Sequence, residues 1–130
     1  MSESPEKMLH EVIRRDGRYP MDAFEFLHEG LARAVRREYG EQLDVEGPKH
    51  VTGPQLCVAL RDEALDRWGL LAKAVLARWN VRATLDFGQM VYLLVDNGLM
   101  QKTDKDSVED FRDVYDFDAA FGAGQVFREG

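Results

Sequence analysis

Four carboxylates near the C-terminus form the densest group of side chains that could do chemistry. Oxygen ligands that converge from one segment can bind Mg²⁺ or Ca²⁺. Their spacing differs from that of an EF-hand loop. If residues 112–117 form a strand, alternate side chains point to opposite faces and the group is divided. We therefore expect a solvated or ion-paired acidic face and no metal or other cofactor. The less favoured alternative is a metal site whose ligands are Asp110, Asp113, Asp116 and Asp118.

A nucleophilic site would have to combine the single cysteine, Cys57, with a histidine. Cys57 falls near the first turn of a predicted helix, where the helix dipole could lower its thiol pKa. It also neighbours the apolar face of that helix, and free cysteines are among the most buried residues. His10, His28 and His50 lie in different predicted elements and form no H-x-x-x-H pair. We therefore predict an inert core thiol and no catalytic set, and a metal-dependent enzyme using residues 110–118 is the remote alternative.

Six arginines are the one basic feature of the sequence. Three lie on or just after the first predicted helix and three on the second. Each set sits near the C-terminal end of its helix, where positive charge complements the dipole, so helix stability alone accounts for them. We also predict that these arginines bind a partner, namely an acidic surface of another protein or of this chain. The alternative partner is RNA or DNA. The six residues are Arg14, Arg15, Arg18, Arg33, Arg36 and Arg37.

The balance of charge disfavours nucleic acid over much of the chain. The net charge is −7. Residues 1–85 hold 13 Lys/Arg and 14 Asp/Glu, whereas residues 86–130 hold only 4 Lys/Arg and 10 Asp/Glu. Because an acidic segment repels phosphate backbones, the last third is not expected to bind DNA or RNA.

Length and composition predict one cytoplasmic globular domain. The 130 residues are 45% hydrophobic and 32% charged, which suits a single folded unit over 1–121 with a loosely ordered tail at 122–130. The lone cysteine is typical of a reducing compartment. The acidic N-terminus lacks the features of a signal peptide. No apolar run approaches the ~20 residues needed to span a bilayer, so no membrane partner is expected.

Apolar periodicity predicts about five helices. Their expected ranges are 5–16, 20–39, 54–68, 70–79 and 86–97. Thr52 and Gln55 have the spacing of a capping box. Asn97-Gly98 closes the last helix, and Leu99 is placed to fold back on Leu94. Trp68 is expected to anchor the core, as is the second tryptophan, at position 79.

Beyond Gly98 the period weakens, and two interpretations stay open. Residues 99–103 and 112–117 could pair as a small hairpin, or Val108, Phe111 and Tyr115 could belong to a helix capped by Ser107. We favour the hairpin with a helical turn inside it. The fold class is therefore mainly α (α+β), with a winged-helix-like end. In that arrangement helix 86–97 takes the recognition position but carries no Lys or Arg, which favours a protein partner over DNA.

Four strings resemble those of a short bacterial family largely restricted to Planctomycetes and Verrucomicrobia. They are YPMDAFEFLHEGL at 19–31, VTGPQL at 51–56, RWNVRATLDFG at 78–88 and DSVEDFRDVYDF at 106–117. The resemblance covers about 13–121. It implies a cytoplasmic bacterial protein and brings no activity, ligand or catalytic residue. Together with the absent catalytic set, it leaves a non-enzymatic macromolecular interaction module as our leading functional hypothesis, with self-association included.

Overall fold

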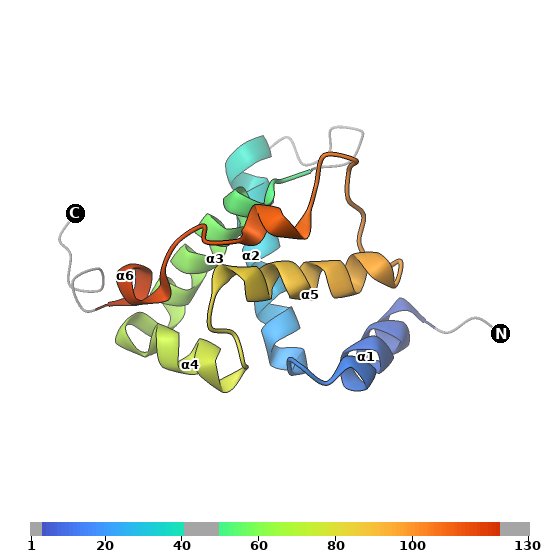
Figure 1. The fold of residues 1–130 in the computed structure, drawn as a ribbon, viewed down its shortest axis with the longest axis horizontal. Helices are drawn as coiled ribbons and strands as arrows, with labels where there is room; N and C mark the ends of the chain where they lie inside the picture. The colour runs from blue at the N-terminus through green and yellow to red at the C-terminus, as the bar shows by residue number, and fades with distance from the viewer. Residues whose placement is uncertain (1–3, 41–49, 123–130) are drawn as a thin grey trace.

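The computed structural model describes residues 4–40 and 50–122 of the chain. Figure 1 shows α5 crossing in front of α2, with α1 beside one end of α2 and η2 lying along α5. The predicted tail lies outside the described residues, apart from Gly122. The elements are α1 (Pro5–Asp16), α2 (Met21–Tyr39), α3 (Gly53–Trp68), η1 (Gly69–Leu71), α4 (Ala72–Arg78), α5 (Thr84–Asp96), η2 (Val108–Phe111) and α6 (Phe117–Phe121).

Two of the predicted helix ends correspond to observed caps, whereas α5 begins at Thr84, two residues before its predicted start. Thr52 and Gln55 form the capping box at the start of α3, the helix that contains Cys57. Gly98, with φ +74°, ends the turn after α5, and the amide of Leu99 donates to the carbonyl of Leu94 at 2.8 Å. A positive φ is readily adopted only by glycine, so this residue type lets the chain reverse and fold Leu99 back onto α5.

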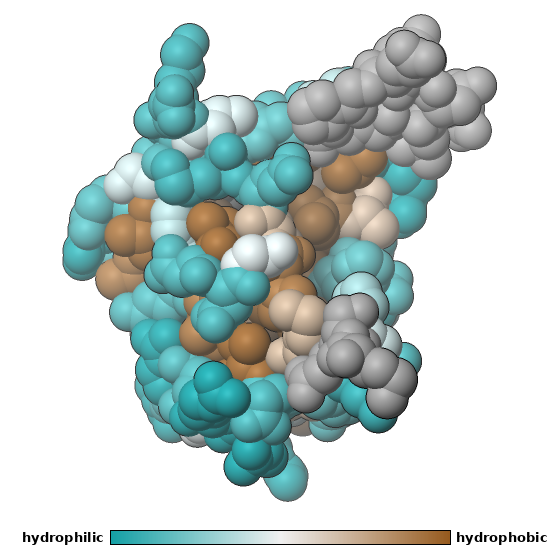
Figure 2. Space-filling model, turned by 90° about the vertical axis from the view of Figure 1, so that its right-hand side faces the viewer, coloured by the Kyte–Doolittle hydropathy of each residue, from teal (hydrophilic) through white to brown (hydrophobic). Residues whose placement is uncertain are grey.

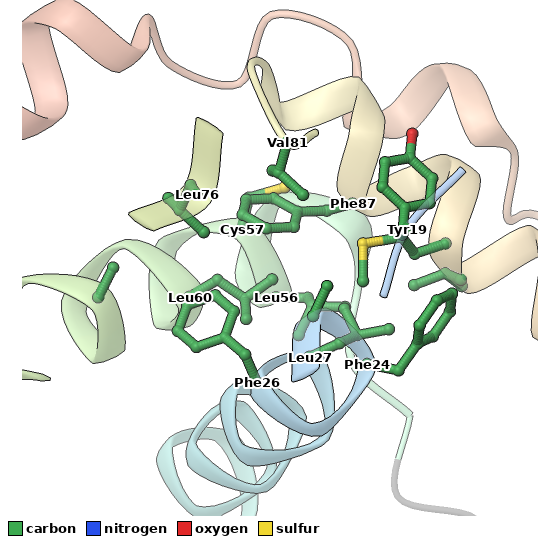
Figure 3. Packing of buried hydrophobic residues seen from close by; sticks show 14 of the residues in the cluster. Tyr19, Phe24, Phe26, Leu27, Leu56, Cys57, Leu60, Leu76, Val81 and Phe87 are labelled. Atoms are coloured by element: carbon green, nitrogen blue, oxygen red, sulfur yellow. The ribbon is translucent and has the colours of Figure 1, made fainter. Parts of the chain in front are cut away.

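The core is built around the close crossing of α2 and α3. A β-carbon on Gly30 of α2 would lie 2.1 Å from Leu60 Cδ2 of α3. Because Gly30 has no side chain, Leu60 can pack directly against the backbone of α2. Figure 3 shows side chains of α2, α3, α4 and α5 meeting here, with Phe26, Leu60 and Phe87 in the same cluster. All three are at most 1% exposed. The two tryptophans, Trp68 and Trp79, are only partly buried and pack against this cluster.

The C-terminal segment lies across α3 and α5. A β-carbon on Gly88 would lie 2.7 Å from the side chain of Phe111, and one on Gly53 would lie 3.1 Å from it. The phenyl ring of Phe111 therefore occupies the space left by two glycines. Thr84, which is 1% exposed, donates its hydroxyl to the carbonyl of Phe111 at 2.6 Å. Burial and this hydrogen bond together fix the segment that follows η2.

The predicted hairpin at 99–103 and 112–117 is wrong, because no residue that the structure describes is in a β-strand. Short-range hydrogen bonds instead close turns in and around this segment. Asp106 accepts from the amide of Thr103, Asp110 from that of Ser107, and Asp116 from that of Ala119. Each cap closes a turn within three residues, so the segment forms η2 and α6.

The winged-helix-like arrangement is wrong for the same reason. A wing is a β-hairpin, and residues 99–117 contain none. Helix α5 is also no exposed recognition helix, since Phe87, Met90 and Leu94 are buried on it. The described part of the chain is helical with no β element. None of its helices has both the length and the apolar content needed to cross a bilayer.

Candidate functional site

The six predicted partner-binding arginines do not form one patch. Arg33 Nη2 lies 2.5 Å from Asp66 Oδ2, and Arg37 Nη2 lies 2.8 Å from Asp62 Oδ2, so these two cations link α2 to α3. Arg36 is exposed on α2. The acidic partners belong to α3 and not to the acidic last third of the chain. We conclude that two of the three α2 arginines already have a role inside the molecule.

The arginines of α1 have partners close to them in sequence. Arg14 and Arg15 both contact Glu11, at 2.6 and 3.1 Å, and Arg18 contacts Asp16 at 3.0 Å. All three cations are well exposed, and exposed ion pairs contribute little to stability. A ligand could therefore recruit these guanidinium groups at small energetic cost.

The four predicted acidic residues do not converge. Asp110 and Asp116 cap turns, as described above, and Asp118 contacts Lys73 of α4. Asp113 has a left-handed φ of +51° and is exposed. In residues 4–40 and 50–122, no group of three or more His, Cys, Asp or Glu side chains could hold a metal ion. The carboxylates thus serve local structure.

The candidate nucleophile and the histidines also lie apart. Cys57 is 0% exposed, and burial raises the pKa of its thiol to about 12, so at neutral pH it is neither ionised nor accessible. His10 and His28 are exposed on α1 and α2. His50 Nε2 lies 3.1 Å from Asp106 Oδ1, which ties the 101–106 loop to the start of the 50–52 segment. The thiol is a core residue.

The structure instead shows an apolar groove that sequence reasoning missed. It has a volume of about 780 Å³ and lies between α1, α2 and the C-terminal end of α5. Figure 2 shows this face of the molecule, where hydrophobic side chains occupy a hollow surrounded by hydrophilic ones. The apolar residues lining the groove include Leu9, Met21, Phe24, Leu27, Leu94, Leu99 and Met100.

Two backbone features create this groove. The turn at Gly98 places Leu99 beside Leu94 at the end of α5. At the other wall, Gly17 with φ +77° ends α1 before the short link to Pro20, and Pro5, Glu6 and Leu9 of α1 line the groove. The helices therefore meet at their ends and leave their apolar sides incompletely covered.

The rim of the groove is acidic. Asp22, Glu25 and Glu29 lie at i, i+3 and i+7, on one face of α2, and Glu6 lies across from them on α1. All four are exposed, and none takes part in an ion pair with another described residue.

One cation, Arg67, lies at the far end of the groove. Its guanidinium carbon is 5.9 Å from the ring centre of Phe26 and 6.0 Å from that of Trp68, and its Nε lies 2.7 Å from Glu63 Oε2. These contacts hold the cation against the aromatic side chains at the edge of the groove. The groove thus combines an apolar floor with net negative charge at its edge.

Part of this site was visible in the sequence. The spacing of Asp22, Glu25 and Glu29 places them on one helical face. The apolar lining could not be assigned, because partly exposed leucines such as Leu9 have the same spacing as buried ones. In the comparisons with known proteins, the chain matches no family model, no curated protein and no solved structure.

Proposed function

We propose that the protein is a docking module whose apolar groove binds a basic amphipathic helix of a partner protein. The observation that carries this proposal is the combination, in one groove, of partly exposed apolar side chains and acidic rim residues without ion-pair partners among the described residues. Burial of apolar area supplies the affinity in such contacts, and charge complementarity selects the partner and its orientation.

The helical form of the partner follows from the shape of the site. A groove between helices accepts the apolar face of an amphipathic helix through residues at i, i+3/i+4 and i+7. The three acidic side chains of α2 repeat along one side of the groove with nearly the same spacing. Lys or Arg residues along one flank of the partner helix can therefore face them in register.

The wider context of the chain is part of this proposal. A net charge of −7 favours encounter with a basic partner over a considerable distance at low salt. We also propose that the protein belongs to the Planctomycetes and Verrucomicrobia family that it resembles. We propose that it is cytoplasmic, and its single, buried thiol is compatible with a reducing compartment.

Binding of designed peptides tests the proposal directly. The probe is a fluorescent amphipathic helix of about 15 residues, roughly four turns, with one Leu face and Lys elsewhere. Its comparison peptide keeps the Leu face and replaces Lys by Glu. We expect the Lys peptide to bind and the Glu peptide to bind at least about tenfold more weakly in fluorescence anisotropy, since like charges then face the rim.

Two matched pairs of variants locate the site. Glu25→Lys/Glu29→Lys should weaken the Lys peptide at least about tenfold, whereas Glu38→Lys/Asp104→Lys, which makes the same change of charge at exposed positions outside the groove, should change affinity by no more than about twofold. Leu9→Gln should weaken binding and Met8→Gln, next to it on α1 and outside the groove, should not. Equal effects within either pair would refute the groove as the binding site.

A further inference from the structure

A second groove adjoins the first, sharing Glu6, Met21 and Trp79 with it, and has the opposite charge. It is about 990 Å³ in volume and is formed by α1, the 17–21 link and residues 78–80 at the end of α4. With 100° per residue, Lys7 and Arg14 lie on one side of α1, and Leu9, which faces the apolar groove, lies about 160° from Lys7. The cations of the second groove and Leu9 of the first therefore lie on different sides of α1, although the two grooves meet at Glu6, Met21 and Trp79.

Cations from three elements meet at this groove. Lys7 and Arg14 come from α1, Arg18 from the link and Arg78 from α4. Against these four positive charges the lining contains two carboxylates, Glu6 and Glu11. An excess of positive charge in one hollow is notable because the chain as a whole carries −7.

Three of the cations are guanidinium groups, and two of them already contact carboxylates, Arg14 that of Glu11 and Arg18 that of Asp16, with which a phosphate would compete. Arg14 is 74% exposed and shares Glu11 with Arg15, while Arg18 is 45% exposed. The guanidinium of Arg18 lies 5.6 Å from the ring centre of Tyr19, which is buried, so this cation is held at the groove wall. Planar guanidinium groups bind two oxygens of one phosphate at once.

An aromatic side chain stands beside these cations. Trp79 lines the groove and is partly exposed, with its inner side packed on Phe26 and Trp68 at centroid distances of 5.9 and 5.4 Å. Aromatic rings next to a basic groove are typical of sites that bind unpaired nucleotides, in which bases stack and phosphates contact Lys and Arg.

We propose that this groove binds the phosphate groups of a nucleotide, either free or within a single nucleic acid strand. Three guanidinium groups in the lining of one groove suit the two charges of a phosphate group better than the single charge of a carboxylate side chain. None of the three acidic residues of α2 lines this groove. The two grooves adjoin at Glu6, Met21 and Trp79, but the proposals rest on different charged residues, the α2 acids in one and the four cations in the other.

Titration with two uridine ligands tests the proposal. One is uridine triphosphate and the other a labelled oligouridylate of about 12 nucleotides, within the range of single-strand site sizes. We expect binding to quench tryptophan fluorescence and to weaken as salt is raised. Full competition by the triphosphate assigns a free nucleotide, and binding of the oligouridylate alone assigns a strand. Failure of both ligands to bind at low salt overturns the proposal.

Matched double variants separate this groove from general attraction. Arg14→Gln/Arg78→Gln removes two lining guanidinium groups and should weaken binding at least about tenfold. Arg15→Gln/Arg82→Gln removes the same charge from exposed neighbours outside the groove, and binding should stay within about twofold. If both pairs lose affinity equally, or if polyglutamate competes as well as the oligouridylate, the assignment to phosphate in this groove is wrong.

The two sites can fail separately. Glu25→Lys/Glu29→Lys, which tests the docking groove, should not weaken oligouridylate binding, because neither residue lines the basic groove. Conversely, Arg14→Gln/Arg78→Gln should not weaken the Lys peptide. Circular dichroism and the urea midpoint of each variant verify that these exposed substitutions leave the fold unchanged.

Discussion

Thr84, the first residue of α5, is hydrogen-bonded to the segment around Phe111, 27 residues later in the chain. Its hydroxyl donates to the carbonyl of Phe111 at 2.6 Å and accepts from the amide of Val114 at 3.1 Å. The side chain is 1% exposed, so water cannot replace either bond. This one hydroxyl satisfies two backbone groups, and one of them, the amide of Val114, lies in the predicted strand 112–117.

Replacing Thr84 by Val should destabilise the protein. The change keeps the shape of the side chain and leaves a buried carbonyl and a buried amide without their partner, for which we expect a loss of about 2–3 kcal/mol in the free energy of unfolding. Urea denaturation followed by circular dichroism measures it. Thr84→Ser retains the hydroxyl and should lose less. A Val variant as stable as the parent protein would show that these bonds are dispensable.

Gly30→Ala should also destabilise, contrary to the usual effect of this change in a helix. In an exposed helix interior, alanine is better than glycine by about 1 kcal/mol. Here the added β-carbon meets Leu60 Cδ2 at 2.1 Å and Cγ at 2.7 Å, so α2 and α3 must separate or the leucine must move. We expect a net loss of about 1–3 kcal/mol, as for other overpacked cores.

A double-mutant cycle with Leu60→Ala tests that cause. The two nearest atoms belong to the leucine side chain beyond its β-carbon, so trimming it removes the clash. The penalty of Gly30→Ala should therefore shrink in the Leu60→Ala background, giving a non-additive cycle. Additive effects would place the cost of Gly30→Ala elsewhere.

Asp106 should make stability depend on pH in the acid range. Burial opposes its ionisation, but hydrogen bonds from Thr103 and the facing imidazole of His50 outweigh burial and hold the pKa of Asp106 below its usual value of 3.8. A carboxyl whose pKa is lower in the folded state stabilises the fold above the pKa of the unfolded chain. That stabilisation is lost as pH falls below about 4 and through the lower folded pKa.

The comparison of parent and Asp106→Asn proteins isolates this effect. The difference between their free energies of unfolding should be largest above about pH 5, and it should diminish toward pH 2 as Asp106 itself becomes protonated. Asp104→Asn, an exposed neighbour, serves as the control. A difference that stays constant from pH 6 to about 2 would show that ionisation of Asp106 contributes nothing.

Helix positions were largely predictable because their signals are local. Ser4, Gly17, Thr52 and Gly98 act within a few residues of their own position, and each marks a helix end or the turn that follows one. The C-terminal segment was mispredicted because apolar residues at 99–103 and 112–117 fit strand spacing as well as coil. The caps Ser107–Asp110 and Asp116–Ala119 are also local. They could not decide between the hairpin and a helical turn, because that choice depended on packing against the rest of the fold.

The candidate sites depended on information that no local pattern contains. Arg14 and Arg78 are 64 positions apart, and they line one groove only because α1 and the end of α4 are neighbours. In the same way, Arg33 looked available for a partner until α3 placed Glu63 and Asp66 beside it.

The sequence by itself determined where the main helices begin and end and that Cys57 belongs to the core, since capping and apolar periodicity are properties of neighbouring residues. The tertiary structure alone decided which charges are neutralised within the fold and which apolar side chains stay partly exposed. Those outcomes depend on how helix ends meet across long sequence separations. Long-range packing, such as Leu60 against Gly30 and Phe111 against Gly88, fixes that arrangement.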